Sequence, residues 1–197
     1  MKEWPLPADP TLRRGRDGIV LVGLGGGARS GPGSLPPLAE VTRRLAELLE
    51  RPVLALEAEA GPDAALSGIS AQAEAREADW LASLEIDVGL ALADGRCWAE
   101  ALGAWRQPAL LVIAAEQLSS GVPAAATALL RHWQVPLLGL VQWGGDWQVG
   151  ARQRDALPWL GRLGPQRRAD ATLEGGSDGE RILATALALR WRQLDRP

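Results

Sequence analysis

The chain has 197 residues, a length typical of one domain. Its hydrophobic fraction of 47% and charged fraction of 23% are close to globular averages, which excludes a disordered chain. The net charge of −3 gives no reason to expect nucleic acid as a partner.

Apolar runs in this sequence are short, and none reaches the roughly 18 residues of a membrane span. The N-terminal residues also lack the apolar stretch of a signal peptide, so we expect a soluble, cytoplasmic protein that does not enter a membrane. One cysteine, Cys97, and one histidine, His132, exclude a Cys-rich zinc site and a multi-histidine metal site. The only lysine is Lys2, which excludes Schiff-base chemistry and a lysine-dependent phosphate loop.

Prolines and arginines in the first 17 residues predict an irregular N-terminal arm ahead of a single domain over residues 18–197. Apolar runs predict strands, and apolar residues at helical spacing predict helices. In the first half of the domain we expect a strand at Ile19–Leu24, a Gly/Pro/Ser loop, a helix at Leu38–Leu49, a strand at Val53–Glu57, a loop at 58–70, an acidic surface helix at Ala71–Leu84 and a weak strand at Asp87–Leu92.

The second half of the chain continues this alternation. The predicted elements are a short helix at Cys97–Trp105, a strand at Ala109–Ala115, a helix at Ala124–Trp133, a strand at Pro136–Gln142, a polar loop at 144–157, a short strand or turn at Pro158–Gly161 and a final helix that begins with a capping box at Ser177–Glu180. Strands that are continuously apolar and alternate with helices predict a mostly parallel sheet covered on both faces, a three-layer α/β/α fold.

The glycine-rich loop after the first strand is the candidate binding site, because ligands of such sheets bind beyond the carboxyl ends of the strands. In the phosphate-loop frame G-x-x-x-x-G-K-[ST], the first glycine and the final serine match, whereas Ala28 replaces the second glycine and arginine replaces the lysine. Backbone N–H groups would hold phosphate, arginine would supply charge and serine would bind Mg²⁺. The candidate residues are Gly23, Gly25, Gly26, Gly27, Arg29 and Ser30.

The same loop also partly fits the dinucleotide fingerprint G-x-G-x-x-G/A, through Gly23, Gly25 and Ala28. Glu57 would be the acid that ends the second strand, but it follows Gly23 by 34 residues instead of about 20. In both templates a helix should begin at once, and Gly31-Pro32-Gly33 prevents this. The loop is therefore open to three interpretations: a structural turn, a nucleotide or anion site, or another role.

The stretch 87–142, DVGLALADGRCWAEALGAWRQPALLVIAAEQLSSGVPAAATALLRHWQVPLLGLVQ, resembles the second half of dethiobiotin synthetases, in the P-loop branch that includes CobQ/CobB-type enzymes. The order of strand, glycine turn, helix, strand, helix and strand agrees. The resemblance implies a P-loop NTPase-like fold with ATP and Mg²⁺ as cofactors. It places the second metal-binding acid near Ala91, with Asp94 as an offset alternative, and the base-reading position near Gln142 or Trp143.

Three functions follow as expectations. The first is a diverged, non-catalytic member of this group that binds a nucleotide or small anion weakly. The second is an ATP- and Mg²⁺-dependent enzyme in which Arg29 replaces lysine and Ser30 holds the metal, and the sequence leaves open whether the protein is an enzyme. The third is an interaction subunit or homodimer that uses the acidic region 57–100 or a tryptophan patch. His132 is interpreted as a helix-end residue and Cys97 as structural. Asp94 is either a turn residue or a metal ligand.

Overall fold

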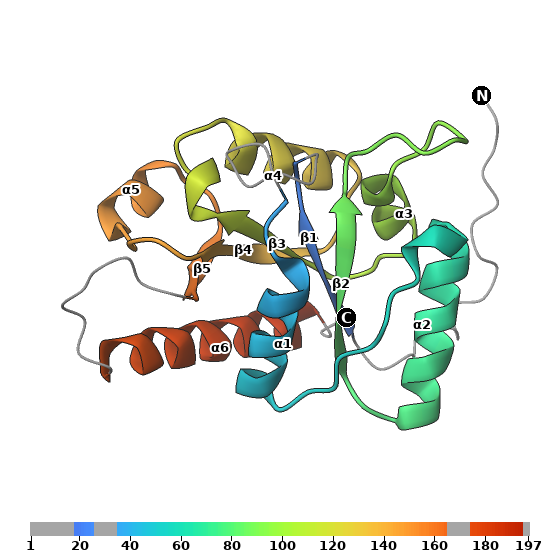
Figure 1. The fold of residues 1–197 in the computed structure, drawn as a ribbon, viewed down its shortest axis with the longest axis horizontal. Coiled ribbons are helices and arrows are strands. Elements are labelled where there is room, and N and C mark those ends of the chain that lie inside the picture. The colour runs from blue at the N-terminus through green and yellow to red at the C-terminus, as the bar shows by residue number, and fades with distance from the viewer. Residues whose placement is uncertain (1–17, 26–34, 165–173, 195–197) are drawn as a thin grey trace.

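A computed structural model describes residues 18–25, 35–164 and 174–194 of the chain (Figure 1). Within these residues, five strands form one sheet in which every neighbouring pair is parallel. Their order across the sheet is β2-β1-β3-β4-β5, so β1 lies between β2 and β3. The strands are β1 Gly18–Gly23, β2 Trp80–Asp87, β3 Ala109–Ala114, β4 Leu137–Trp143 and β5 Trp159–Leu163.

Alternate residues of β1 pack on opposite faces of the sheet, because successive strand side chains point in opposite directions. Val20 and Val22 join the apolar cluster on one face, and Ile19 and Leu21 join the cluster on the other face. Every residue of β1 and β3 is buried. Burial on both faces is why these strands are continuously apolar in sequence.

Helices cover both faces of the sheet, which confirms the predicted three-layer α/β/α fold (Figure 1). The first cluster is covered by α2 Pro62–Arg76, α3 Trp98–Ala104 and α4 Val122–His132. The second is covered by α1 Leu38–Leu49 and α6 Glu174–Leu194. The remaining elements are α5 Val149–Arg154 and the 3-10 helices η2 Ala58–Ala60 and η3 Ala115–Gln117.

Most of the predicted elements are confirmed with ends that agree to within two residues. The predicted strands at 19–24, 109–115 and 136–142 correspond to β1, β3 and β4. The predicted helices at 38–49, 97–105 and 124–133 correspond to α1, α3 and α4. At Pro158–Gly161, where a short strand or a turn was predicted, the structure has the strand β5. The N-terminal arm predicted at 1–17 lies outside the described residues.

The predictions for residues 58–70 and 77–84 are wrong, whereas the helix predicted from Ala71 is confirmed as far as Arg76. The loop predicted at 58–70 contains η2 and most of α2, which begins with Pro62 at its first turn, a position that proline favours. The helix predicted to continue to Leu84 ends at Arg76, because Glu77 adopts a left-handed conformation with φ 51°. Trp80 to Leu84 form β2 instead. Pairing with β1 and burial outweigh the helical preference of the preceding alanine- and glutamate-rich sequence.

Two predicted strands are also wrong. At Val53–Glu57 the structure has a single bridge between Val53 and Leu81 at the edge of β2, and Val53 is 46% exposed. The strand predicted at Asp87–Leu92 is absent, because β2 ends at Asp87 and the chain turns there.

The last two differences concern helix positions. The loop predicted at 144–157 contains the short helix α5. The final helix begins at Glu174, so the capping box predicted at Ser177 does not start it.

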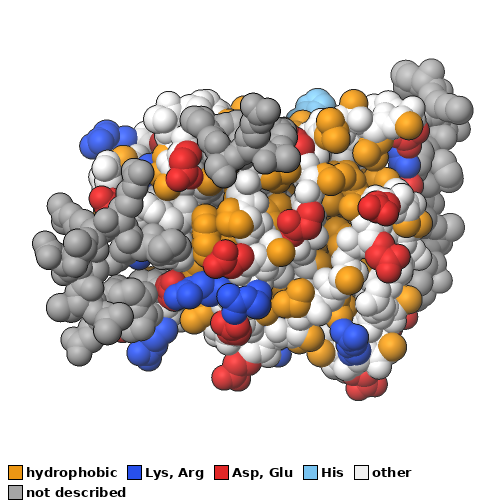
Figure 2. Space-filling model, viewed as in Figure 1, with side chains coloured by type: hydrophobic (Ala, Val, Ile, Leu, Met, Phe, Trp, Pro, Cys, Tyr) orange, Lys and Arg blue, Asp and Glu red, His pale blue; other side chains and the backbone are white. Residues whose placement is uncertain are grey.

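Figure 2 shows acidic and basic side chains interspersed over the face that carries α1 and α6.

Candidate functional site

The carboxyl end of β1 lies at the point where the strand order reverses. The chain passes from β1 to β2 on one side and then crosses to β3 on the other side of β1. In parallel sheets with this order, ligands bind in the crevice beyond the carboxyl ends of the strands at such a switch point. Gly23 ends β1, and Gly25 follows it with φ 144°, a conformation that favours glycine. The structure therefore places two predicted site residues at the expected edge.

The chain also returns to this point before α1 begins. A Cβ atom added to Gly23 would lie 2.9 Å from Leu35 Cδ2 and 2.9 Å from Pro36 Cδ. The residue at the strand end is small because the returning chain packs directly against it. The intervening candidates Gly26, Gly27, Arg29 and Ser30 lie outside the described residues.

Asp87 is a site residue that the sequence analysis missed. It ends β2 beside β1, where its Oδ2 accepts the Gly25 N–H at 2.8 Å and its Oδ1 accepts the Gly89 N–H at 2.7 Å. A carboxylate has about four lone-pair positions, so this one keeps capacity for further donors or a cation. The signal that could have found it is the segment Leu84–Gly89, in which apolar and acidic residues alternate up to Asp87 and a glycine follows two residues later.

Gln117 is a second residue that the sequence analysis missed. It is fully buried in η3, just after β3. Its Oε1 accepts the Ala114 N–H at 3.0 Å, and its Nε2 donates to the Leu24 carbonyl oxygen at 2.8 Å. One side chain therefore joins the carboxyl end of β3 to the start of the candidate loop, while Asp87 anchors that loop from the β2 side.

Asp94 is held in an ion pair. Its Oδ2 accepts Arg96 Nε–H at 2.8 Å, its Oδ1 accepts the Arg96 backbone N–H at 3.1 Å, and Arg96 also contacts Asp63 Oδ2 at 3.0 Å. The hydrogen bond from the Arg96 side chain is the main reason that the pKa of Asp94 lies below its ordinary value. In the part of the chain that the structure describes, no group of three or more His, Cys, Asp or Glu side chains could hold a metal ion. Of the two interpretations of Asp94, the geometry favours the turn residue.

Removing the Arg96 charge should raise the pKa of Asp94. A carboxyl group whose pKa falls on folding stabilises the folded state above its unfolded-state pKa, and this contribution disappears as the pH falls through the folded-state pKa. A carboxyl ¹³C NMR titration should therefore show a higher pKa for Asp94 in Arg96→Gln than in the wild type. Arg181→Gln, at an exposed arginine on α6, is the control and should leave Asp94 unchanged. An unchanged titration in Arg96→Gln would contradict the assigned pairing.

Gln142 and Trp143, at the position expected to recognise the nucleotide base, contact other parts of the protein. Gln142 is fully buried, and its Nε2 donates to the carbonyl oxygens of Gly144 at 2.8 Å and Asp146 at 3.1 Å. Trp143 lies so close to Gly164 that a Cβ added there would be 2.7 Å from its indole ring. These contacts shape the loop after β4.

The structure also places Glu57, His132 and Cys97, and none of them lies at the loop after β1. Glu57 is exposed ahead of η2 and ends no strand, which removes the acid that the dinucleotide fingerprint needs. His132 is the exposed last residue of α4, as predicted. Cys97 is a half-buried free cysteine just before α3, and its backbone forms an isolated antiparallel β-bridge with Ala91.

Comparison of the chain with protein-family models and with curated protein sequences gives no match. Among the described residues, no helix is both long and apolar enough to cross a membrane.

Proposed function

We propose that the protein binds a nucleotide or another phosphate-bearing anion at the loop after β1, as a diverged, non-catalytic relative of dethiobiotin-synthetase-like P-loop proteins. The observation that carries this proposal is the anchoring of Gly25 at the switch point of the sheet by the Asp87 carboxylate. The chain leaves β1 after Gly23, and Leu35 and Pro36 pack back against Gly23. The loop therefore begins and ends beside the crevice where ligands of such folds bind.

Asp87 supports a metal-bound form of the ligand. A carboxylate close to a polyphosphate repels it unless a cation lies between them. Mg²⁺ is commonly bound by one or two carboxylates together with substrate phosphates and water, so a single acid with spare lone pairs fits this ion. When bound, Mg²⁺ would neutralise phosphate charge, and Asp87 would orient it. We therefore expect Mg·ATP to bind more tightly than free ATP.

The absence of a suitable lysine supports binding without turnover. P-loop enzymes place a lysine on the β- and γ-phosphates, whereas the only lysine here is Lys2, ahead of β1. Arg29 supplies a positive charge in that frame of the sequence. Its planar guanidinium is a poor substitute for a compact ammonium group.

Thermal melting with tryptophan fluorescence tests the proposal. A ligand at 100 times its Kd stabilises the folded state by about 2.7 kcal/mol, which raises the Tm of a chain of this size by about 5–10 °C. We expect this rise with Mg·ATP, a smaller one with ATP and EDTA, and none with Mg²⁺ alone. Arg29→Ala should abolish the rise, and Asp87→Asn should remove the difference between Mg·ATP and ATP with EDTA.

Arg43→Ala is the matched control, because Arg43 is an exposed arginine on α1 that pairs with Glu47. It should bind Mg·ATP as the wild type does. An unchanged Tm at millimolar Mg·ATP, or an equal rise in Arg29→Ala, would contradict the proposal. Steady release of phosphate from ATP that is lost in Arg29→Ala would instead favour the enzyme.

A further inference from the structure

Two large apolar side chains stand exposed on one face of α6. Ile182 is 68% exposed and Leu189 is 55% exposed. They are seven residues apart, nearly two helical turns, so they lie on the same side of the helix. Six large apolar side chains are exposed in the part of the chain that the structure describes, and no other helix there carries two of them. This face of α6 therefore differs from the rest of the described surface.

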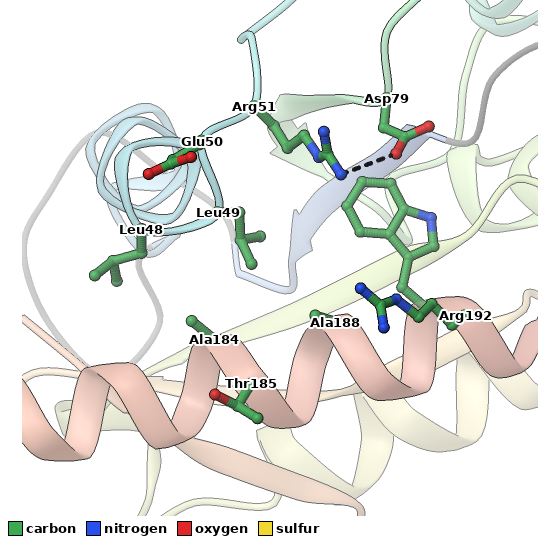
Figure 3. Close-up of a pocket in the computed structure, with 10 residues that line it drawn as sticks. Leu48, Leu49, Glu50, Arg51, Asp79, Ala184, Thr185, Ala188 and Arg192 are labelled. Carbon is green, nitrogen blue, oxygen red and sulfur yellow. Dashed lines mark ion pairs between the residues drawn. The ribbon is translucent and has the colours of Figure 1, made fainter.

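The opposite face of α6 is occupied by the fold. Leu183, Leu187 and Trp191 are buried in the apolar cluster between α1, α6 and the sheet. Figure 3 shows Ala184 and Ala188 directed toward α1, at the pocket beside its end, and Thr185 directed away from it. The face that carries Ile182 and Leu189 has no such cover. At Gly179, one turn earlier, an added Cβ would meet no atom within 4 Å.

Charges of opposite sign flank the two ends of this apolar pair. Asp178 precedes Ile182 by four residues, and Arg192 follows Leu189 by three, so each lies beside one of the two apolar side chains. Both charged residues are exposed. Asp178 contacts Arg181 only at 3.8 Å, and both of those side chains are 78% exposed, which makes the contact weak.

Asp178, Thr185 and Arg192 are spaced by seven residues and therefore form one row along the helix. The row is acidic at its start, neutral in the middle and basic at its end. Such a row is complementary to itself when it is reversed. An antiparallel copy would bring opposite charges together at both ends, whereas a parallel copy would bring like charges together.

We propose that this face of α6 binds the same face of a second copy of the chain, with the two helices antiparallel. A two-fold axis at Thr185 places Asp178 of each copy opposite Arg192 of the other, so the pair forms twice. Ile182 of each copy then lies beside Leu189 of the other. The small Ala186 side chain, which shares their face, lets the helices approach to the usual 8–10 Å between axes.

The interface predicts a weak dimer. Each copy contributes two large apolar side chains, which places the buried area at the low end for specific contacts between proteins. Exposed ion pairs add little affinity and mainly select the orientation. We therefore expect a monomer at low micromolar concentration and a dimer that accumulates toward millimolar concentration. This association does not involve the loop after β1.

Sedimentation velocity over this concentration range tests the apolar part of the interface. Ile182→Glu and Leu189→Glu should each weaken dimerisation more than tenfold, because each places a carboxylate in the contact. Both side chains are exposed in the monomer, so the variants should fold. Val149→Glu is the matched control, since Val149 in α5 is also 55% exposed, and this variant should dimerise as the wild type does.

Reversing the flanking charges tests the antiparallel orientation. Asp178→Arg and Arg192→Asp should each weaken dimerisation about fivefold or more, because each replaces two opposite-charge contacts with two like-charge contacts. The double variant should recover the affinity of the wild type. A monomer at every concentration, unchanged dimerisation in Ile182→Glu, or no recovery in the double variant would each overturn the proposal.

Discussion

Replacing Gly103 with alanine is expected to lower the free energy of unfolding by about 3 kcal/mol or more, at the upper end of the cost of overpacking. Gly103 lies in α3 against the end of α4, where an added Cβ would be 1.8 Å from the carbonyl oxygen of Trp133. Because the clash is with backbone, no side-chain rotation relieves it, and the two helices must separate. Urea denaturation followed by tryptophan fluorescence measures the loss.

Gly68→Ala is the matched control for this substitution. Gly68 lies in α2, and no atom lies within 4 Å of the position that its Cβ would take. Alanine should stabilise the helix there by about 0.5–1 kcal/mol, since glycine loses more backbone entropy on folding. Equal stabilities of Gly103→Ala and Gly68→Ala would show that α3 and α4 do not meet as closely as the structure has them.

The second large effect is expected at Gln117, which joins β3 to the candidate loop. Gln117→Met keeps the length of the side chain but leaves the Ala114 N–H and the Leu24 carbonyl oxygen without this partner. Since a buried polar group left unpaired costs about 1–3 kcal/mol, we expect a total loss of about 3 kcal/mol. Because Leu24 opens the candidate loop, the Tm increase with Mg·ATP should also shrink.

Gln107→Met separates the loss of a buried amide from the effect on the site. Gln107 Nε2 donates to the Gly18 carbonyl oxygen at 2.7 Å, at the other end of β1, and the side chain is only half-buried. This variant should lose about 1 kcal/mol and keep the full response to Mg·ATP. If the two variants lose equal stability and respond equally to nucleotide, Gln117 has no special role in holding the loop.

The central strands were predictable from sequence because they are buried on both faces. Residues 19–22 and 109–113 are continuous apolar runs, and such runs indicate buried strands without any knowledge of their neighbours in the fold. The strand at Trp80–Asp87 was not predictable in this way. Its preceding residues favour helix, and only pairing with β1 makes the segment a strand. Conversely, Val53 to Glu57 has a strand-like composition, but the chain makes one bridge there and turns away.

The residues of the candidate site also differ in whether local sequence could reveal them. Gly23 and Gly25 follow an obvious strand, and glycines at a strand end are visible in one sequence. Asp87 and Gln117 reach this site only because β2 and β3 both neighbour β1, a long-range arrangement that local spacing does not encode. The Asp94–Arg96 pair was close in sequence, yet its geometry depends on the bend that joins β2 to α3.

Mapping the amide resonances during a titration with Mg·ATP tests the central claim most directly, because it locates the ligand as well as detecting it. We predict saturable shifts in the ¹H–¹⁵N spectrum at Leu24, Gly25, Val88 and Gly89, at the carboxyl edge of β1 and β2. Residues at the opposite ends of the strands, such as Arg51 and Asp79, should not shift. An absence of shifts at the carboxyl edge at millimolar Mg·ATP, or shifts confined to other surfaces, would contradict the claim that the loop after β1 is the binding site.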